Sequence, residues 1–145
     1  MQYPASQTTI IHSVTGDKQL QFSDRTPAAR HQDVEYIHVH LQGRDVPNCS
    51  SKIDLYYGSD LVEFFKELSD QWQGWEGEKK WESTDHSLIL TATSDRLGHI
   101  SLEVEISSGS FPLEWMLRTT IALEAGGLER IAADVKEFLG TEGNH

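Results

Sequence analysis

The sequence contains little cysteine, few basic residues and no long apolar run. Its single cysteine, Cys49, cannot form a disulfide within the chain, which excludes a disulfide-framed secreted scaffold and suits a reducing compartment. No segment is apolar over the length needed to span a membrane, and residues 1–7 do not resemble a signal peptide. We therefore expect a soluble protein of the cytoplasm.

Acidic side chains greatly outnumber basic ones in the second part of the chain. Residues 1–59 carry 5 lysines and arginines against 6 aspartates and glutamates, whereas residues 60–145 carry 7 against 17, and the whole chain has a formal net charge of −11. Such an excess opposes direct binding to nucleic acid or to anionic lipid. It favours a basic protein partner or serves only solubility.

The sequence also lacks the common catalytic and cofactor motifs. It has no Gly-x-Ser-x-Gly nucleophile elbow, no dinucleotide fingerprint and no glycine loop placed to hold a phosphate at the start of a helix. Nothing beside Cys49 in sequence would lower the pKa of its thiol. We expect no cofactor, and the sequence leaves open whether the protein has any enzymatic activity.

Apolar periodicity predicts eight strands and two helices. Alternation at a period of two indicates strands at residues 7–14, 19–23, 35–42, 52–57, 75–83, 87–93, 99–107 and 115–124. Spacings of three and four indicate a helix from a cap at Asp60, with Glu63 completing a capping box, to near Gly74, and another over residues 128–139. Residues 46–48 read as a turn, and residues 24–32 as a loop.

This order predicts one α+β domain over residues 1–145, with mainly antiparallel sheet and two helices packed on it. The spacing of Ile53-x-Leu55-x-x-Gly58 is repeated by Ile121-x-Leu123-x-x-Gly126, each at the passage from a strand to a helix. The chain would then consist of two ββββα halves, residues 7–73 and 74–139, although short matches of this kind also arise by chance.

Three motifs occur in order along the chain: W-x-G-W-x-G-E-x-x-W-x-S at residues 72–83, L-x-A-T-x-D-x-x-G-H at residues 90–99 and L-E-A-G-x-L-E-x-I-A at residues 123–132. Together they resemble an uncharacterised bacterial family, one of the domains of unknown function common in actinobacterial genomes. The resemblance covers about residues 60–140. It implies a small cytoplasmic bacterial protein and supplies no activity or site residues.

The strand alternation places a set of glutamates away from the expected core. If their strands are neighbours, these carboxylates form an acidic face that could occupy a basic groove on a partner, as an immunity-type inhibitor of a toxin does. A homo-oligomer is the other kind of assembly we consider. The glutamates of the acidic face are Glu76, Glu78, Glu82, Glu103, Glu105 and Glu114.

The tryptophans offer a second hypothesis, a cleft for a small ligand. Lys79 falls on the aromatic side of its strand and could anchor a ligand there, or its side chain could extend past a tryptophan to water. His99 follows a turn glycine and could act as a base or bond within the turn. The residues of this candidate cleft are Trp72, Trp75, Lys79, Trp81, His99 and Trp115.

Two histidines give the strongest metal-like signal. His38 and His40 occupy alternate positions of one strand and therefore share a face. Two ligands do not make a site, and no spacing in the sequence supplies a third, so we expect no bound metal. The leading hypothesis is a non-enzymatic protein-binding domain that uses the acidic face, and the alternative is a small-ligand binder or enzyme that uses the tryptophans.

Overall fold

Two four-stranded antiparallel sheets and two helices make up the computed structural model, which describes residues 8–26, 34–56, 59–109 and 112–139. Each sheet is a meander, with strand order β1-β2-β3-β4 in one and β5-β6-β7-β8 in the other. The elements are β1 Thr8–His12, β2 Lys18–Thr26, β3 Val34–Gly43, β4 Val46–Tyr56, α1 Ser59–Asp70, β5 Lys79–Glu82, β6 Leu88–Ser94, β7 His99–Ser107, β8 Met116–Glu124, the short 3-10 turn Ala125–Gly127 and α2 Leu128–Leu139.

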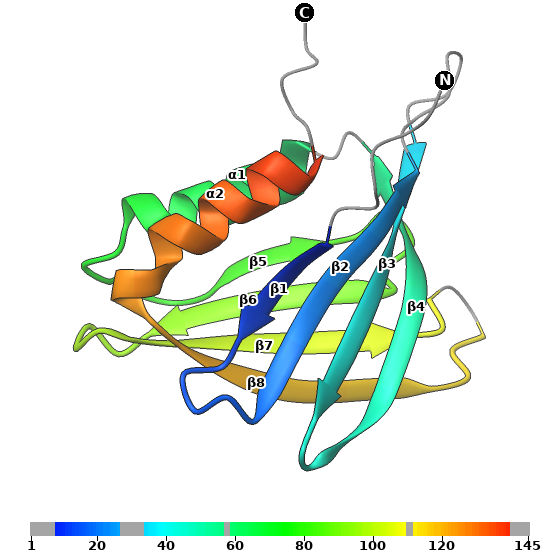
Figure 1. Cartoon of the computed structure of the whole chain (residues 1–145), viewed down its shortest axis with the longest axis horizontal. Helices are drawn as coiled ribbons and strands as arrows, with labels where there is room; N and C mark the ends of the chain where they lie inside the picture. The colour runs from blue at the N-terminus through cyan, green and yellow to red at the C-terminus, as the bar shows by residue number, and fades with distance from the viewer. Residues whose placement is uncertain (1–7, 27–33, 57–58, 110–111, 140–145) are drawn as a thin grey trace, which may run out of the picture.

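The sheets pack face to face with their strands crossing, and α1 and α2 lie side by side along one side of this sandwich (Figure 1). Helix α1 contacts β5, and α2 contacts β1, so each helix lies against an edge strand. Burying one face of each sheet and one stripe of each helix gives a shared core. The α+β class and the ββββα order of elements predicted from periodicity are confirmed.

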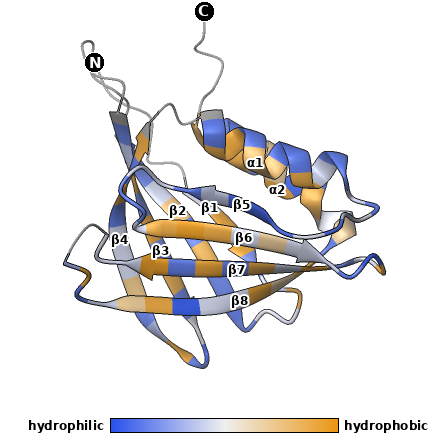
Figure 2. Ribbon diagram, turned by 180° about the vertical axis from the view of Figure 1, so that it is seen from behind, coloured by the Kyte–Doolittle hydropathy of each residue, from blue (hydrophilic) through white to orange (hydrophobic). Residues whose placement is uncertain are grey.

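Alternation of side chains accounts for this burial. Along the strands hydrophobic and hydrophilic residues alternate (Figure 2), because successive side chains of a strand point to opposite faces. The inward side chains of the sheets include Leu20, Phe22, Ile37, Val39, Leu41, Leu90, Leu102, Val104, Ile106 and Ile121, all of them fully buried.

Several predicted boundaries are wrong. Helix α1 begins at Ser59, so Asp60 lies within its first turn, and it ends at Asp70. The predicted turn at residues 46–48 belongs to β4, where Pro47 is tolerated because β4 is an edge strand and one side of it needs no ladder bonds. Residues 24–26, predicted as loop, extend β2, while Gly58 and residues 27–33 lie outside the described part of the chain.

The tryptophan-rich strand is much shorter than predicted, since β5 covers only Lys79–Glu82. Gly74 and Gly77 before it have φ values of +121° and +77°, a backbone conformation that a strand does not contain. Trp75 therefore lies in a connecting segment. From Lys79 onward the predicted alternation holds, with Lys79 and Trp81 partly buried and Lys80 and Glu82 exposed.

A β-bulge in β2 places a charged pair at the inward face of the first sheet. Asp24 has φ of +51°, and the register of β2 against β3 shifts between Ser23 and Thr26. Such a bulge changes the direction in which the next side chain points. Arg25 reaches the buried carboxylate of Glu35, where its Nε and Nη2 both lie 3.1 Å from Oε1. The inward face of β3 thus begins with an ion pair.

Candidate functional site

The outer face of the second sheet carries the most distinctive charged cluster of the described residues. Strand pairing sets Glu105 opposite Arg118 and Glu103 opposite Thr120. The Arg118 guanidinium lies 3.1 Å from a Glu105 oxygen and 3.8 Å from a Glu103 oxygen. One cation is therefore shared between two carboxylates on exposed sheet surface.

Exposed apolar side chains lie where the chain enters β8, close in sequence to Arg118. The exposed fractions of Leu113, Trp115 and Met116 are 54%, 42% and 47%. The segment is held at the end of β7 because the Ser108 N–H donates to the Trp115 carbonyl at 3.1 Å and the Glu114 N–H donates to the Ser108 hydroxyl at 2.9 Å. We define the β7–β8 patch as Glu103, Glu105, Leu113, Trp115, Met116 and Arg118.

Alternation along β8 connects the two parts of the patch. Met116 and Arg118 are two residues apart, so both point outward, and Ser107 is the strand partner of Met116. Exposed leucine, tryptophan and methionine side chains within a few residues of Arg118 along the chain are a composition typical of protein-binding surfaces. In such a surface the apolar side chains of the β7–β8 patch would anchor a partner, and its charged side chains would contact the partner's polar groups.

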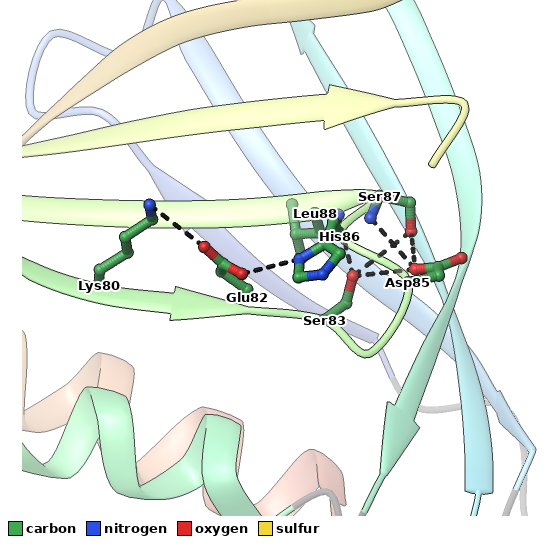
Figure 3. Close-up of polar contacts among 7 residues, drawn as sticks. All are labelled: Lys80, Glu82, Ser83, Asp85, His86, Ser87 and Leu88. Atoms are coloured by element: carbon green, nitrogen blue, oxygen red, sulfur yellow. Dashed lines mark hydrogen bonds and ion pairs between the residues drawn. The ribbon is translucent and has the colours of Figure 1, made fainter. Parts of the chain in front are cut away.

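The acidic row continues across the sheet to β5. Glu82 is the strand partner of Ile89, and Ile89 is the partner of Glu105. Lys80 at 3.2 Å and His86 at 2.7 Å both contact the Glu82 carboxylate (Figure 3). These hydrogen bonds, that of Lys80 foremost, hold the pKa of Glu82 below its usual range.

The structure brings together only part of the predicted acidic face. Glu82, Glu103 and Glu105 share the outer face of one sheet, but cations neutralise much of their charge. Glu114 precedes β8, whereas Glu76 and Glu78 precede β5, and Glu76 pairs with Arg96 of the β6–β7 turn at 2.9 Å. The outer face of this sheet thus carries opposite charges side by side and is not a purely acidic face.

A model of a protein family matches residues 11–142, and this family is described as a family of unknown function (DUF6228). The chain belongs to this family. No curated protein matches the sequence. The family supplies no site residues, so any function must be argued from the side chains themselves.

The tryptophans do not converge in the structure. Trp75 is buried and its indole N–H donates to the Ala92 carbonyl at 3.3 Å, and Trp81 packs partly buried against the core. Trp72 is 56% exposed beyond α1, and Trp115 belongs to the β7–β8 patch. Two surface grooves, one at the β1–β2 and β3–β4 turns and one between β1 and α2, have no tryptophan in their lining. A ligand cleft built from them stays a prediction without structural support.

Lys79 is explained by its neighbours rather than by a ligand. Its ammonium lies 2.6 Å from a Glu67 oxygen of α1 and 5.7 Å from the centre of the Trp75 ring. A lysine can extend its apolar stem over an aromatic ring while its charge reaches a carboxylate. Lys79 therefore joins β5 to α1.

His99 bonds within its turn. Its Nδ1 lies 2.6 Å from Asp95 Oδ2, and Asp95 Oδ1 accepts the backbone N–H groups of Leu97 at 2.7 Å and of His99 at 3.1 Å. The bond from the Leu97 N–H, followed by that of the His99 ring, lowers the pKa of Asp95. Bonding within the turn is thus the arrangement that His99 adopts, one of the two alternatives considered for it.

The histidine pair lies on the outer face of the first sheet. His38 and His40 of β3 have Lys52 and Ser50 as their partners on β4. Among the residues that the structure describes, no three or more His, Cys, Asp or Glu side chains are grouped so that they could hold a metal ion. Neither α1 nor α2, each of 12 residues, has the length or apolar character to cross a membrane.

A cluster at the β5–β6 turn contains the residue types of a hydrolase but not their arrangement. Asp85 Oδ1 accepts hydrogen bonds from the hydroxyls of Ser83 at 3.1 Å and Ser87 at 2.6 Å, while the His86 ring contacts Glu82 instead (Figure 3). In a catalytic triad the histidine contacts the serine and the acid contacts the histidine. These bonds instead stabilise the turn.

The same turn is built twice. In the β1–β2 hairpin the Ser13 N–H donates to the Lys18 carbonyl at 3.0 Å and the Lys18 N–H donates to the Ser13 hydroxyl at 3.2 Å. In the β5–β6 hairpin Ser83 and Leu88 form the same two bonds, at 2.9 and 3.1 Å. A buried serine at the first position satisfies a backbone N–H in both hairpins.

Sequence reasoning missed the apolar half of the patch. Alternation did place Met116 and Arg118 on the outward face, and that signal was available. What it could not supply was the exposure of Leu113 and Trp115, because tryptophan and leucine are as common in a core as on a binding surface.

Proposed function

We propose that this chain is a non-enzymatic protein-binding domain that contacts its partner through the β7–β8 patch. The observation that carries the proposal is the exposure of Leu113, Trp115 and Met116 in the segment that leads into β8, where Met116 shares the outward face of Arg118. Tryptophan and arginine are the residues most often found as energetic anchors of interfaces, and charged groups around them set specificity and association rate.

The charge of the chain supports a basic partner. With a net charge of −11, the protein attracts a cationic surface from a distance and repels acidic ones. Glu82, Glu103 and Glu105 then supply carboxylates on the outer face of the same sheet. The most concrete form of this function is an immunity-type inhibitor that occupies the basic groove of a toxin. Bacterial origin, a cytoplasmic location, the two-half division of the domain and a homo-oligomeric state also remain proposals.

Affinity capture from a lysate of the source organism tests the proposal when patch variants are compared with a matched control. The wild-type protein and Trp72→Ser, which removes an exposed tryptophan elsewhere, should retain the same basic partner at low salt. Trp115→Ser with Met116→Ser should lower the affinity for that partner about 30-fold or more, as expected when an anchor worth about 2 kcal/mol is lost.

The charged rim needs a separate variant. Glu103→Lys with Glu105→Lys should weaken capture mainly at low salt, because salt screens exposed charges. Equal capture of every partner by wild type and by both patch variants would refute this contact surface.

A further inference from the structure

The outer edge of β1, the first strand of its sheet, is a second candidate binding site. The Ser13 N–H bonds to the Lys18 carbonyl, so Ser13 and the residues of the same parity, Ile11 and Thr9, direct their backbone groups toward β2. Backbone direction alternates along an antiparallel strand. The N–H and C=O groups of Thr8 and Ile10 therefore point away from the sheet.

The hydrogen bond of Val14 supports this parity. Val14 also has even parity, and its N–H donates outward to the Ala122 carbonyl of β8 at 2.8 Å. Within the described part of the chain, Val14 is the even-numbered residue of 8–14 whose backbone N–H bonds to another element. From Val14 toward the N-terminus, the outer edge of β1 includes Ile10, whose side chain is 36% exposed.

Helix α2 turns this edge into a groove. The Thr9 hydroxyl donates to the Asp134 carbonyl at 3.2 Å, which fixes the helix beside the strand. Between them lies an open groove of about 370 Å³. Its lining residues are Thr8, Thr9, Ile10, Asp134, Glu137 and Phe138.

The groove has a definite chemistry. Phe138 is buried beneath it and Ile10 borders it, so an occupant gains apolar contact. Asp134 and Glu137 are the charged side chains of its lining, which contains no lysine or arginine. A second copy of the chain would bring its own β1, whose residues Thr8–His12 also include neither. Charge complementarity therefore favours a lysine- or arginine-bearing segment of another protein.

We propose that the groove between β1 and α2 binds an extended cationic segment of a partner protein, which adds to the sheet as a strand beside β1. Main-chain bonds to Thr8 and Ile10 would give affinity, and Asp134 and Glu137 would select basic side chains. This site is separate from the β7–β8 patch, on the other sheet, and does not depend on the function proposed for that patch. It explains why an edge strand with exposed Ile10 carries no protective lysine or proline.

The test uses an acetylated and amidated octapeptide of alternating lysine and valine as the probe. In a titration followed by NMR, the backbone amides of Thr8 and Ile10 should shift, and the Ile10 amide should exchange more slowly with solvent. A peptide with glutamate in place of lysine should not bind. Neither should a peptide N-methylated at alternate residues, because it cannot form the main-chain bonds of an added strand.

Matched protein variants assign the site. Asp134→Asn with Glu137→Gln, which preserves side-chain shape, should weaken the lysine peptide about five- to tenfold. Glu129→Gln, an exposed change elsewhere on α2, and Trp115→Ser in the β7–β8 patch should leave the affinity unchanged. The last control separates failure of this proposal from failure of the proposed function.

Several outcomes would overturn the proposal. One is the absence of binding at about 1 mM peptide, and another is equal binding of the N-methylated or glutamate peptide. An Ile10 amide already protected in the free protein would show a different occupant. Protection that grows with protein concentration would identify a second copy, and protection independent of concentration would identify another segment of this chain.

Discussion

The ion pair between Arg25 and Glu35 allows a quantitative test of the fold. Glu35 is 6% exposed on the inward face of β3, and both guanidinium contacts go to a single oxygen, Oε1. Arg25→Met keeps most of the aliphatic stem and removes the charge. The variant therefore leaves a buried carboxylate without its cation, which is the costly way to break a buried pair.

The structure sets the size of the loss. Removing one partner of a fully buried pair costs about 3–5 kcal/mol. The Arg25 side chain is 29% exposed, so water already screens part of the interaction. We expect Arg25→Met to lower the free energy of unfolding by about 2–3 kcal/mol at pH 8.

The loss should depend on pH in a definite direction. Burial raises the pKa of Glu35, and Arg25 opposes that rise. Without Arg25, burial acts unopposed and the pKa rises further. A carboxyl that is more basic in the folded state destabilises the fold as pH increases from the ordinary glutamate pKa through the raised value. The destabilisation by Arg25→Met should therefore be smaller at pH 5 than at pH 8.

Urea unfolding followed by tryptophan fluorescence, at pH 5 and pH 8, measures these differences. Arg25→Met, Glu35→Gln and the double variant complete a thermodynamic cycle with the wild type. In the double variant no charge is buried alone, so its stability should exceed that of Arg25→Met at pH 8. A loss below about 0.5 kcal/mol, or an equal loss at both pH values, would refute the reasoning.

Two further predictions use matched pairs of substitutions, measured by thermal unfolding. Trp75→Phe should lower stability by about 1–3 kcal/mol and shift the remaining fluorescence to the red, since Trp75 is buried, whereas Trp72→Phe should change stability by less than about 0.5 kcal/mol. Gly43→Ala should cost about 1–3 kcal/mol because its Cβ would lie 2.7 Å from the Asp17 carbonyl oxygen, while Gly126→Ala meets no atom within 4 Å and should be nearly neutral. Equal effects within either pair would contradict the packing described.

Much of the fold follows from the sequence, because alternation and helical spacing report directly on which side chains are buried. The unbroken pattern of residues 99–107 became β7 with the same bounds. The pattern failed where backbone conformation and not burial decided the structure. Positive φ at Gly74 and Gly77 ended the tryptophan strand, and the edge position of β4 admitted Pro47. Neither effect is visible in a hydrophobic pattern.

The candidate site was less predictable, because it depends on which strands are neighbours. The sequence puts Glu103, Glu105 and Arg118 on outward faces, but only the pairing of β7 with β8 brings the arginine between the two carboxylates. In the same way, no sequence pattern distinguishes buried Trp75 from exposed Trp115. Sequence period determines the face of a strand, and tertiary packing determines what that face contacts.

The attachment of β1 has a consequence for the order of folding. Val14 is bonded to Ala122 and Thr9 to Asp134, so this strand is held by residues more than 100 positions later in the chain. Contacts so distant in sequence form slowly, because a long loop must close before they contribute any stability. During synthesis the first strand leaves the ribosome well before its partners in β8 and α2 exist. Strand β1 can pair with β2 early, but its bonds to β8 and α2 have to wait until the last part of the chain has been synthesised.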